Sequence, residues 1–173
     1  MSINDPFGKF NGKELEYLST YLDSQNKESK VPWVQRFEEK VAQYLGIKYA
    51  VSCNSGTSAL HMAMVACNIG PGDEVLVPAL TVVMDAYSVI HVGAKPVFVD
   101  VNRSTYGIDV QEIEKKITKK TKAIIFVSLF GNMDGIDEIN LIAKNNCNIP
   151  VIEDGAQSFG SKFSNRNSCS ITT

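Results

Sequence analysis

The sequence is poor in the residues that build metal sites and disulfide frameworks. Its 173 residues include four cysteines and two histidines, and the cysteines show no CxxC spacing. The six positions are Cys53, Cys67, Cys147, Cys169, His61 and His91. Cysteines scattered in this way predict reduced, mostly buried thiols rather than disulfides or a metal centre.

Long apolar segments and blocks of one charge are also missing. The N-terminus lacks the basic and then apolar pattern of a signal peptide, and no apolar run is long enough to span a bilayer. Seventeen basic and nineteen acidic side chains give a net charge of -2. We interpret the densest basic stretch, residues 115–122, as a solvated helix end whose cations suit the helix dipole. We therefore expect a soluble cytoplasmic protein that binds neither membranes nor nucleic acid.

What is present is a regular alternation of strand and helix patterns. Hydrophobic residues make up 44 % of the chain, enough for one sizeable core. Strand-like apolar runs occupy residues 49–53, 74–77, 96–99, 123–127 and 150–153. Their continuous apolar character suits a sheet that is covered on both faces. The pattern predicts a single α/β unit with a mainly parallel, doubly wound sheet.

Helix signals lie before and between these runs. Two amphipathic helices open the sequence, and the second, with Phe37 and Val41 on its apolar face, is expected to end at Gly46. Asp109 and Glu112 resemble a capping box that opens a later helix. Residues 161–173 are polar and small, which is typical of a tail or a loop.

The segment NSGTSAL at residues 54–60 is the first with chemical meaning. It follows a predicted strand and opens a predicted helix, so its backbone N–H groups can point at an anion. The hydroxyls of Thr57 and Ser58 can add donors. A phosphate site and a purely structural helix cap explain this pattern equally well.

A second segment, EDGAQS at residues 153–158, places two acids at the end of an apolar strand. Ligands of open α/β sheets bind at the carboxyl ends of the strands. Alternation sends Glu153 and Asp154 to opposite sides, so one of them is expected to face a ligand. A metal-binding acid and a solvated loop carboxylate remain alternatives.

Together these segments resemble the DegT/DnrJ/EryC1/StrS family of sugar aminotransferases, fold-type I enzymes that depend on pyridoxal phosphate (PLP). The resemblance runs from about Trp33 to Thr173. It includes GPGDEV at residues 70–75, Pro78 with Thr81, GAKPVFVD at 93–100, TKAII at 121–125 and Phe130 with Gly131. It implies a partial large domain of the fold-type I transferase fold.

The resemblance also implies roles for individual residues. Gly56, Thr57 and Ser58 would hold the PLP phosphate, Asp154 would pair with the protonated pyridine nitrogen, and Gln157 would bind the phenolic oxygen of the ring. A carboxylate beside that nitrogen favours the pyridinium, which accepts electrons from the substrate.

Two positions depart from the family pattern. Val82 stands where members often stack an aromatic ring on the cofactor, and Ser128 stands where they often have histidine. An aliphatic wall can cover the ring but supplies no stacking.

The lysine that binds PLP covalently in the family is expected after Thr173, so we assign no catalytic residue within the chain. Lys162 lies in a polar loop and is expected to be solvated. We predict an N-terminal arm and helix at residues 1–30 and a PLP-binding large domain at 31–173, without the small C-terminal domain. The 173 residues alone are expected to be inactive and to bind PLP weakly or not at all.

The implied activity is amino transfer, with glutamate as the usual donor, to a nucleotide-linked keto-sugar in surface polysaccharide or amino-sugar biosynthesis. The family forms its active sites at a homodimer interface. A sugar dehydratase with histidine in place of the lysine, and a non-catalytic remnant or regulatory partner, remain alternatives. An α/β domain without a ligand is the third.

Overall fold

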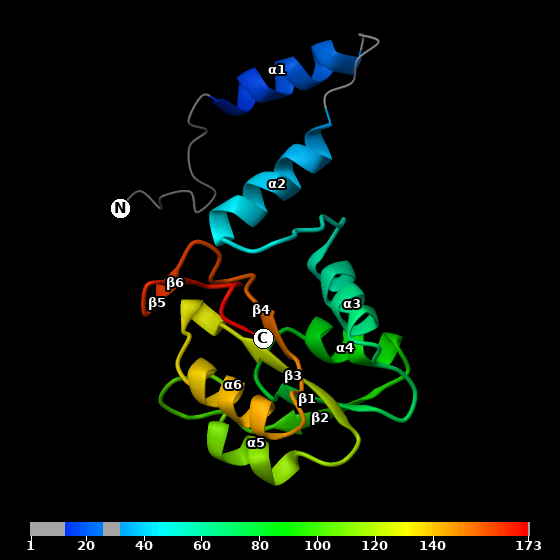
Figure 1. Cartoon of the computed structure of the whole chain (residues 1–173), viewed down its shortest axis with the longest axis vertical. Coiled ribbons are helices and arrows are strands. Elements are labelled where there is room, and N and C mark those ends of the chain that lie inside the picture. Colours follow the sequence, from blue (N-terminus) through cyan, green and yellow to red (C-terminus); the bar gives the residue numbers. More distant parts are fainter. Residues whose placement is uncertain (1–12, 26–31, 173) are drawn as a thin grey trace, which may run out of the picture.

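The computed structural model describes residues 13–25 and 32–172. Part of the arm expected at residues 1–30 therefore lies outside the described residues. Helices are α1 (Lys13–Gln25), α2 (Trp33–Leu45), α3 (Gly56–Ala66), α4 (Met84–His91), α5 (Val110–Lys116) and α6 (Ile136–Asn145), with a short 3-10 helix η1 (Leu129–Gly131). The chain order alternates strands and helices from α3 to β4, as the sequence predicts (Figure 1).

Four parallel strands form the central sheet. They are β1 (Glu74–Pro78), β2 (Lys95–Val99), β3 (Thr121–Val127) and β4 (Val151–Asp154), in the spatial order β2-β1-β3-β4. In register, Leu76 of β1 faces Ile124 of β3, and Val127 of β3 faces Asp154 of β4. Four of the five predicted strands and the parallel sheet are therefore confirmed.

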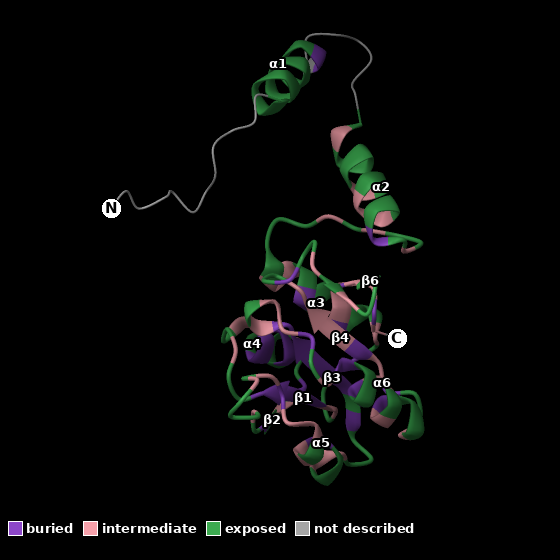
Figure 2. Ribbon diagram, turned by 90° about the vertical axis from the view of Figure 1, so that its left-hand side faces the viewer, coloured by how far each residue is buried: buried purple, intermediate pink, exposed green. Residues whose placement is uncertain are grey.

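Helices cover both faces of this sheet (Figure 1). On one face α3 and α4 bury Met64 and Val89 against Val75, Val77 and Ile125. On the other face the core combines strand residues with α5 and α6; it includes Leu76, Ile113, Ile124, Phe126, Ile136 and Ile139. Alternate residues of each strand point to opposite faces, so β1 and β3 supply both cores. Figure 2 shows the resulting buried centre.

The two N-terminal helices stand apart from this sheet (Figure 1). Helix α2 ends at Gly46, which takes the left-handed conformation (φ 72°) and donates its N–H to the carbonyl of Gln43, as predicted. Tyr17 and Tyr21 of α1 meet the ring of Trp33 edge-on. These aromatic contacts join α1 to the start of α2.

Residues 49–53 are not a strand, so that prediction is wrong. The segment carries no strand assignment, and Tyr49 and Val51 are 72 % and 69 % exposed. Both the N–H and the hydroxyl of Ser52 donate to Glu38 Oε1, at 2.8 and 2.9 Å. A helix side chain thus takes the place of the neighbouring strand that a ladder requires.

The polar C-terminal stretch is ordered rather than a simple tail. Strands β5 (Lys162–Phe163) and β6 (Arg166–Asn167) form an antiparallel hairpin. Beyond it, Ser168 and Ile171 are buried, and Asn140 of α6 donates to the carbonyl of Ile171 at 3.1 Å. Phe163 also packs against the core, and Arg166 pairs with Asp137 of α6. A few such contacts order a polar stretch, which composition does not reveal.

The cysteines are free, as expected, but none is buried. Cys53 and Cys147 are exposed, and Cys67 and Cys169 are half-buried. Cys53 is the last residue of the unpaired segment 49–53, and Cys147 lies in a left-handed turn after α6 (φ 64°), where the chain leaves the core. Among the described residues we find neither a cluster of three metal-binding side chains nor a helix long and apolar enough to cross a membrane.

Candidate functional site

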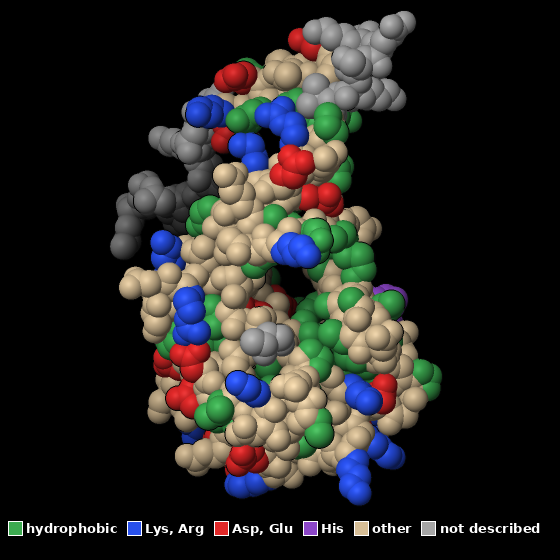
Figure 3. Space-filling model, viewed as in Figure 1, with side chains coloured by type: hydrophobic (Ala, Val, Ile, Leu, Met, Phe, Trp, Pro, Cys, Tyr) green, Lys and Arg blue, Asp and Glu red, His purple; other side chains and the backbone are tan. Residues whose placement is uncertain are grey.

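A pocket of about 470 Å³ opens at the carboxyl edge of the sheet, between the start of α3, the loop after β1 and the end of β4. Its size falls within the usual range for small-molecule sites. It is lined by Gly56, Thr57, Ala59, Leu60, Ala63, Val82, Met84, Ile152, Glu153, Asp154, Gly155 and Ala156. Figure 3 shows a hollow with acidic side chains at its depth and hydrophobic side chains along one wall.

The structure brings four of the six predicted cofactor residues to this one pocket. They are Gly56, Thr57, Val82 and Asp154. Ser58 and Gln157 lie outside its wall. Because these residues are up to 98 positions apart in sequence, their convergence is a property of the fold rather than of one motif.

The N-terminus of α3 forms one end of the pocket. Ser55 caps this helix, since its side chain accepts the N–H of Ser58 at 3.2 Å. The hydroxyl of Ser58 donates to Asn54 Oδ1 at 2.8 Å, so Ser58 belongs to the cap. The first N–H groups of a helix, here those of Gly56 and Thr57, have no acceptor within the helix. This end therefore offers donors and a positive dipole to an anion.

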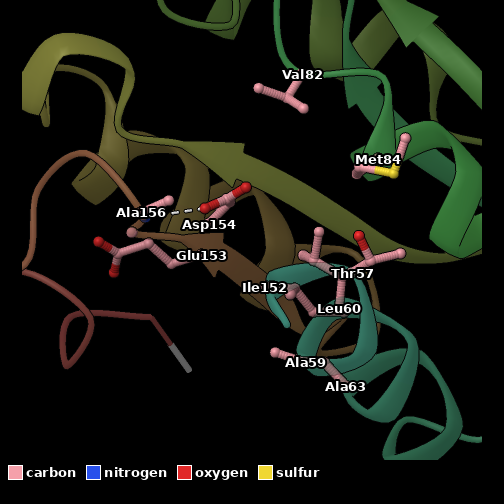
Figure 4. A pocket seen from close by; sticks show the side chains of 12 residues that line it. Thr57, Ala59, Leu60, Ala63, Val82, Met84, Ile152, Glu153, Asp154 and Ala156 are labelled. Atoms are coloured by element: carbon pink, nitrogen blue, oxygen red, sulfur yellow. Dashed lines mark hydrogen bonds between the residues drawn. The ribbon is translucent and has the colours of Figure 1, made fainter. Parts of the chain in front are cut away.

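The end of β4 forms the opposite, acidic end. Asp154 Oδ1 accepts the N–H of Ala156 at 2.9 Å, and the carboxylate points across the cavity towards Val82 and Met84 (Figure 4). Glu153 also contributes to the wall, but its carboxylate turns away and accepts the N–H of Cys169 at 2.9 Å. The prediction that the two acids face opposite sides is confirmed.

Burial changes the ionisation of the groups behind Asp154. The pKa of Glu153 is raised by burial, only partly offset by the N–H of Cys169, and the pKa of the Cys169 thiol is raised for the same reason. Glu153 Oε2 is buried without a hydrogen-bond partner among the described residues. Asp154 remains the acid of β4 that faces the cavity.

Asp85 is an acid near the pocket that the sequence argument missed. It lies in the first turn of α4, fully buried, and its Oδ2 accepts the hydroxyl of Thr81 at 2.5 Å. Burial raises its pKa to about 6, and the nearby Asp154 adds to the shift. The available signal was a lone carboxyl inside the apolar run VVMDA at residues 82–86.

Ser128 and Gln157 support the pocket from outside. Ser128 is buried and bonds the carbonyl of Asp154 through both its N–H and its hydroxyl, at 3.2 and 3.1 Å. Gln157 Oε1 accepts the N–H of Phe130 at 2.7 Å. These contacts fix the ends of β3 and β4 relative to each other, so the backbone of Asp154 is held in place.

Comparison with known proteins places the sequence in a family. The model of the DegT/DnrJ/EryC1/StrS aminotransferase family matches residues 9–173. A UDP-2-acetamido-2-deoxy-3-oxo-D-glucuronate aminotransferase of Pseudomonas aeruginosa is 47 % identical over 142 residues, which are 82 % of this chain and 39 % of that protein. The chain thus spans about two fifths of the length of such relatives.

Two solved structures share the fold. An aminotransferase from Psychrobacter cryohalolentis superposes with a TM-score of 0.89 at 36 % identity, covering 97 % of this chain and 42 % of that one. The E. coli GDP-4-keto-6-deoxy-D-mannose-3-dehydratase with bound hydrated PLP gives 0.82 at 32 % identity, covering 97 % and 45 %. The architecture is that of part of the large domain of PLP-dependent sugar aminotransferases, and the chain belongs to the DegT/DnrJ/EryC1/StrS aminotransferase family.

Proposed function

We propose that this chain supplies much of the PLP cradle of an enzyme that transfers an amino group, from glutamate, to a nucleotide-linked keto-sugar. The observation that carries the proposal is the pocket between the N-terminus of α3 and the carboxylate of Asp154. The aminotransferase from Pseudomonas aeruginosa supports the substrate class. The pathway we propose is surface polysaccharide or amino-sugar biosynthesis in the cytoplasm, with a homodimer as the active form.

The residues present fit PLP at both of its charged ends. A phosphate matches the N–H donors and dipole of the first turn of α3, and Gly56 leaves open space there because an added Cβ would meet no atom within 4 Å. A protonated pyridine nitrogen matches Asp154, whose Oδ1 is already held by Ala156. The apolar side chains of Leu60, Val82 and Met84 suit the ring between them.

Each side chain then has one task. PLP, when bound, supplies an electron-accepting ring. Thr57 binds the phosphate, Asp154 holds the proton on the pyridine nitrogen, and Val82 covers a face of the ring and excludes water. Gln157 is exposed and engaged with Phe130, so its contact with the phenolic oxygen stays a prediction. The chain by itself is not expected to turn over.

Dehydration of a nucleotide-linked keto-sugar is the second candidate. The similarity to the E. coli dehydratase favours it, because that enzyme shares the fold that carries PLP. The two candidates use the same cradle. They separate on the sugar product: amination leaves a nitrogen in place of the keto oxygen, whereas the dehydratase removes a hydroxyl as water and leaves no nitrogen on the ring.

Titration with PLP tests the cradle. We expect weak but saturable binding, followed by absorbance of the cofactor. Thr57→Ala should lower the affinity roughly tenfold further, the cost of about one hydrogen bond to a charged group. Unchanged affinity in Thr57→Ala would contradict the proposal that Thr57 binds the phosphate of PLP.

The matched control is Lys119→Ala, which deletes a cation at the opposite edge of the sheet, where a second pocket includes Lys119 and Lys122. It should leave PLP binding unchanged.

Borohydride reduction followed by peptide mapping should show no adduct on Lys162, which is exposed on β5. A clean adduct there would contradict the proposed cradle.

A further inference from the structure

The carboxyl group of Asp85 occupies an unusual place behind the pocket. Its side chain is fully buried, and one oxygen accepts the hydroxyl of Thr81. The other oxygen, Oδ1, is buried without a hydrogen-bond partner among the described residues. A buried polar atom that lacks a partner is costly, so this oxygen needs a donor or a proton of its own.

The neighbouring acid can serve as that partner. Asp85 lies in the first turn of α4, next to Met84 of the pocket wall, and Asp154 ends β4 with its carboxylate turned towards Met84 (Figure 4). Two separate elements therefore bring the two carboxyl groups to the same side of the cavity. Two ionised carboxylates that lie close together at a buried site repel each other. One proton between them converts this repulsion into a hydrogen bond, because a protonated carboxyl donates and a carboxylate accepts.

We propose that Asp85 is a positioning residue for Asp154: it carries one proton and donates it as a hydrogen bond to the Asp154 carboxylate. Thr81 holds the second oxygen of Asp85, and Ala156 holds Oδ1 of Asp154. Together these hydrogen bonds hold the carboxylate of Asp154 so that it faces the cavity. The proposal rests on the proposed function, since the group that Asp154 would face is the pyridine nitrogen of PLP.

The electrostatic surroundings favour this arrangement. Burial is the main reason why the pKa of Asp85 rises to about 6, and Asp154 raises it further, against the opposing bond from Thr81. Other titratable side chains on elements packed against α4 have partners elsewhere. His61 of α3 meets His91 of α4 ring to ring, and Glu74 of β1 pairs with Lys95 of β2.

Asparagine and leucine separate this role from simple packing. Asp85→Asn keeps the shape and has an amide N–H that mimics the proposed O–H donor, so it should retain PLP affinity at pH 5, where Asp85 of the wild type keeps its proton. Asp85→Leu has the same branched arrangement of heavy atoms but no donor, and it should weaken affinity severalfold at that pH. If Asn and Leu weaken binding equally, the ionised form is what matters and the proposal fails.

The pH profile gives a second readout. The ratio of PLP affinity in the wild type to that in Asp85→Asn cancels the ionisation of the ligand itself. As pH rises through about 6, this ratio should fall, by up to about tenfold per unit, because the wild type loses its donor and asparagine does not. A ratio that stays flat between pH 5 and pH 8, about one unit below and two units above the transition, would overturn the proposal.

Carbon-13 NMR of the aspartate carboxyls in the ligand-free protein keeps this test independent of cofactor binding. Asp85 should titrate at raised pH, and Asp154→Asn should shift its titration downward by roughly one unit, since coupled acids share their protons. An Asp85 titration that ignores Asp154→Asn would sink the proposal. Failure of PLP to bind, with the coupled titration intact, would instead count against the proposed function alone.

Discussion

The two ends of the pocket are built in different ways. At the α3 end, residues 54–58 are contiguous and their side chains bond within the segment. Ser55 accepts the N–H of Ser58, and the hydroxyl of Ser58 donates to Asn54. At the β4 end, Asp154 depends on groups from distant segments, including Asp85 on α4 and Ser128 after β3. The first end is therefore held by contacts that are local in sequence, and the second by contacts between distant segments. Changes at the second should therefore have larger and less local effects.

The largest effect is expected from Asp154→Ala. Removing the carboxylate leaves a cationic ring nitrogen without its partner, which should weaken PLP binding by about 2–5 kcal/mol. Calorimetric titration measures the loss. Asp154→Asn is the control, because it keeps an acceptor for the N–H of Ala156 but removes the charge. It should unfold at nearly the wild-type temperature and still bind weakly, and wild-type affinity in either variant would contradict the assignment.

The next effect is the pH dependence contributed by Asp85. Its pKa is raised from 3.8 to about 6 in the folded protein, so the folded state binds this proton more tightly than the unfolded state. The free energy of unfolding should fall as pH rises between these two values and remain lower above them, by up to about 3 kcal/mol. Asp85→Asn should abolish this loss in urea unfolding measured from pH 4 to pH 8. A variant as pH-sensitive as the wild type would show that another group is responsible.

Gly155→Ala should destabilise the acidic end of the pocket through a steric clash. A Cβ at this position would overlap Sγ of Cys169, so the segment after β6 must move. Overpacking of this kind costs about 1–3 kcal/mol, measurable by thermal unfolding. Adding Cys169→Ala to Gly155→Ala removes the sulfur and should recover most of the loss. A double variant as unstable as the single one would show that the contact is not the cause.

The smallest effect is expected at the local end. Ser55→Ala removes the cap of α3 and should lower stability by about 1 kcal/mol, visible as a small decrease in the unfolding temperature. Ser55→Asp keeps a capping side chain and should restore stability. It also places a negative charge beside the phosphate donors, so it should weaken PLP binding. Restored stability together with unaltered binding would argue against a phosphate at this end.

Sequence patterns predict the locally determined features of the molecule better than those that depend on distant segments. Continuous apolar runs predict β1 to β4. Strands β1 and β3 are buried between two helical layers, and the edge strands β2 and β4 add Val99 and Val151 to the core. The capping residue Asp109 begins α5 as expected by accepting the N–H of Gln111. The segment NSGTSAL predicts the local end of the pocket because capping is encoded within five residues. Residues 49–53 have the same apolar character as the strands but no neighbouring strand among the described residues, and pairing is not a local property.

The acidic end is harder to predict for a physical reason. The position of Asp154 follows from the strand that precedes it, but the position of Asp85 depends on how α4 packs against β1 and β2. Likewise, Cys169 fits against Gly155 only because the hairpin of β5 and β6 returns the chain to the pocket. Sequence patterns identify which residues end an element; the tertiary fold decides which ends meet.

Amide NMR of the labelled protein during addition of PLP tests the central claim most directly. We predict that the largest shifts fall on Gly56, Thr57, Asp154 and Gly155, the residues at the two ends of the pocket. Inorganic phosphate should move only the first two. Shifts centred instead on Lys119 and Lys122, where two cations border the second pocket at the other edge of the sheet, would contradict the account.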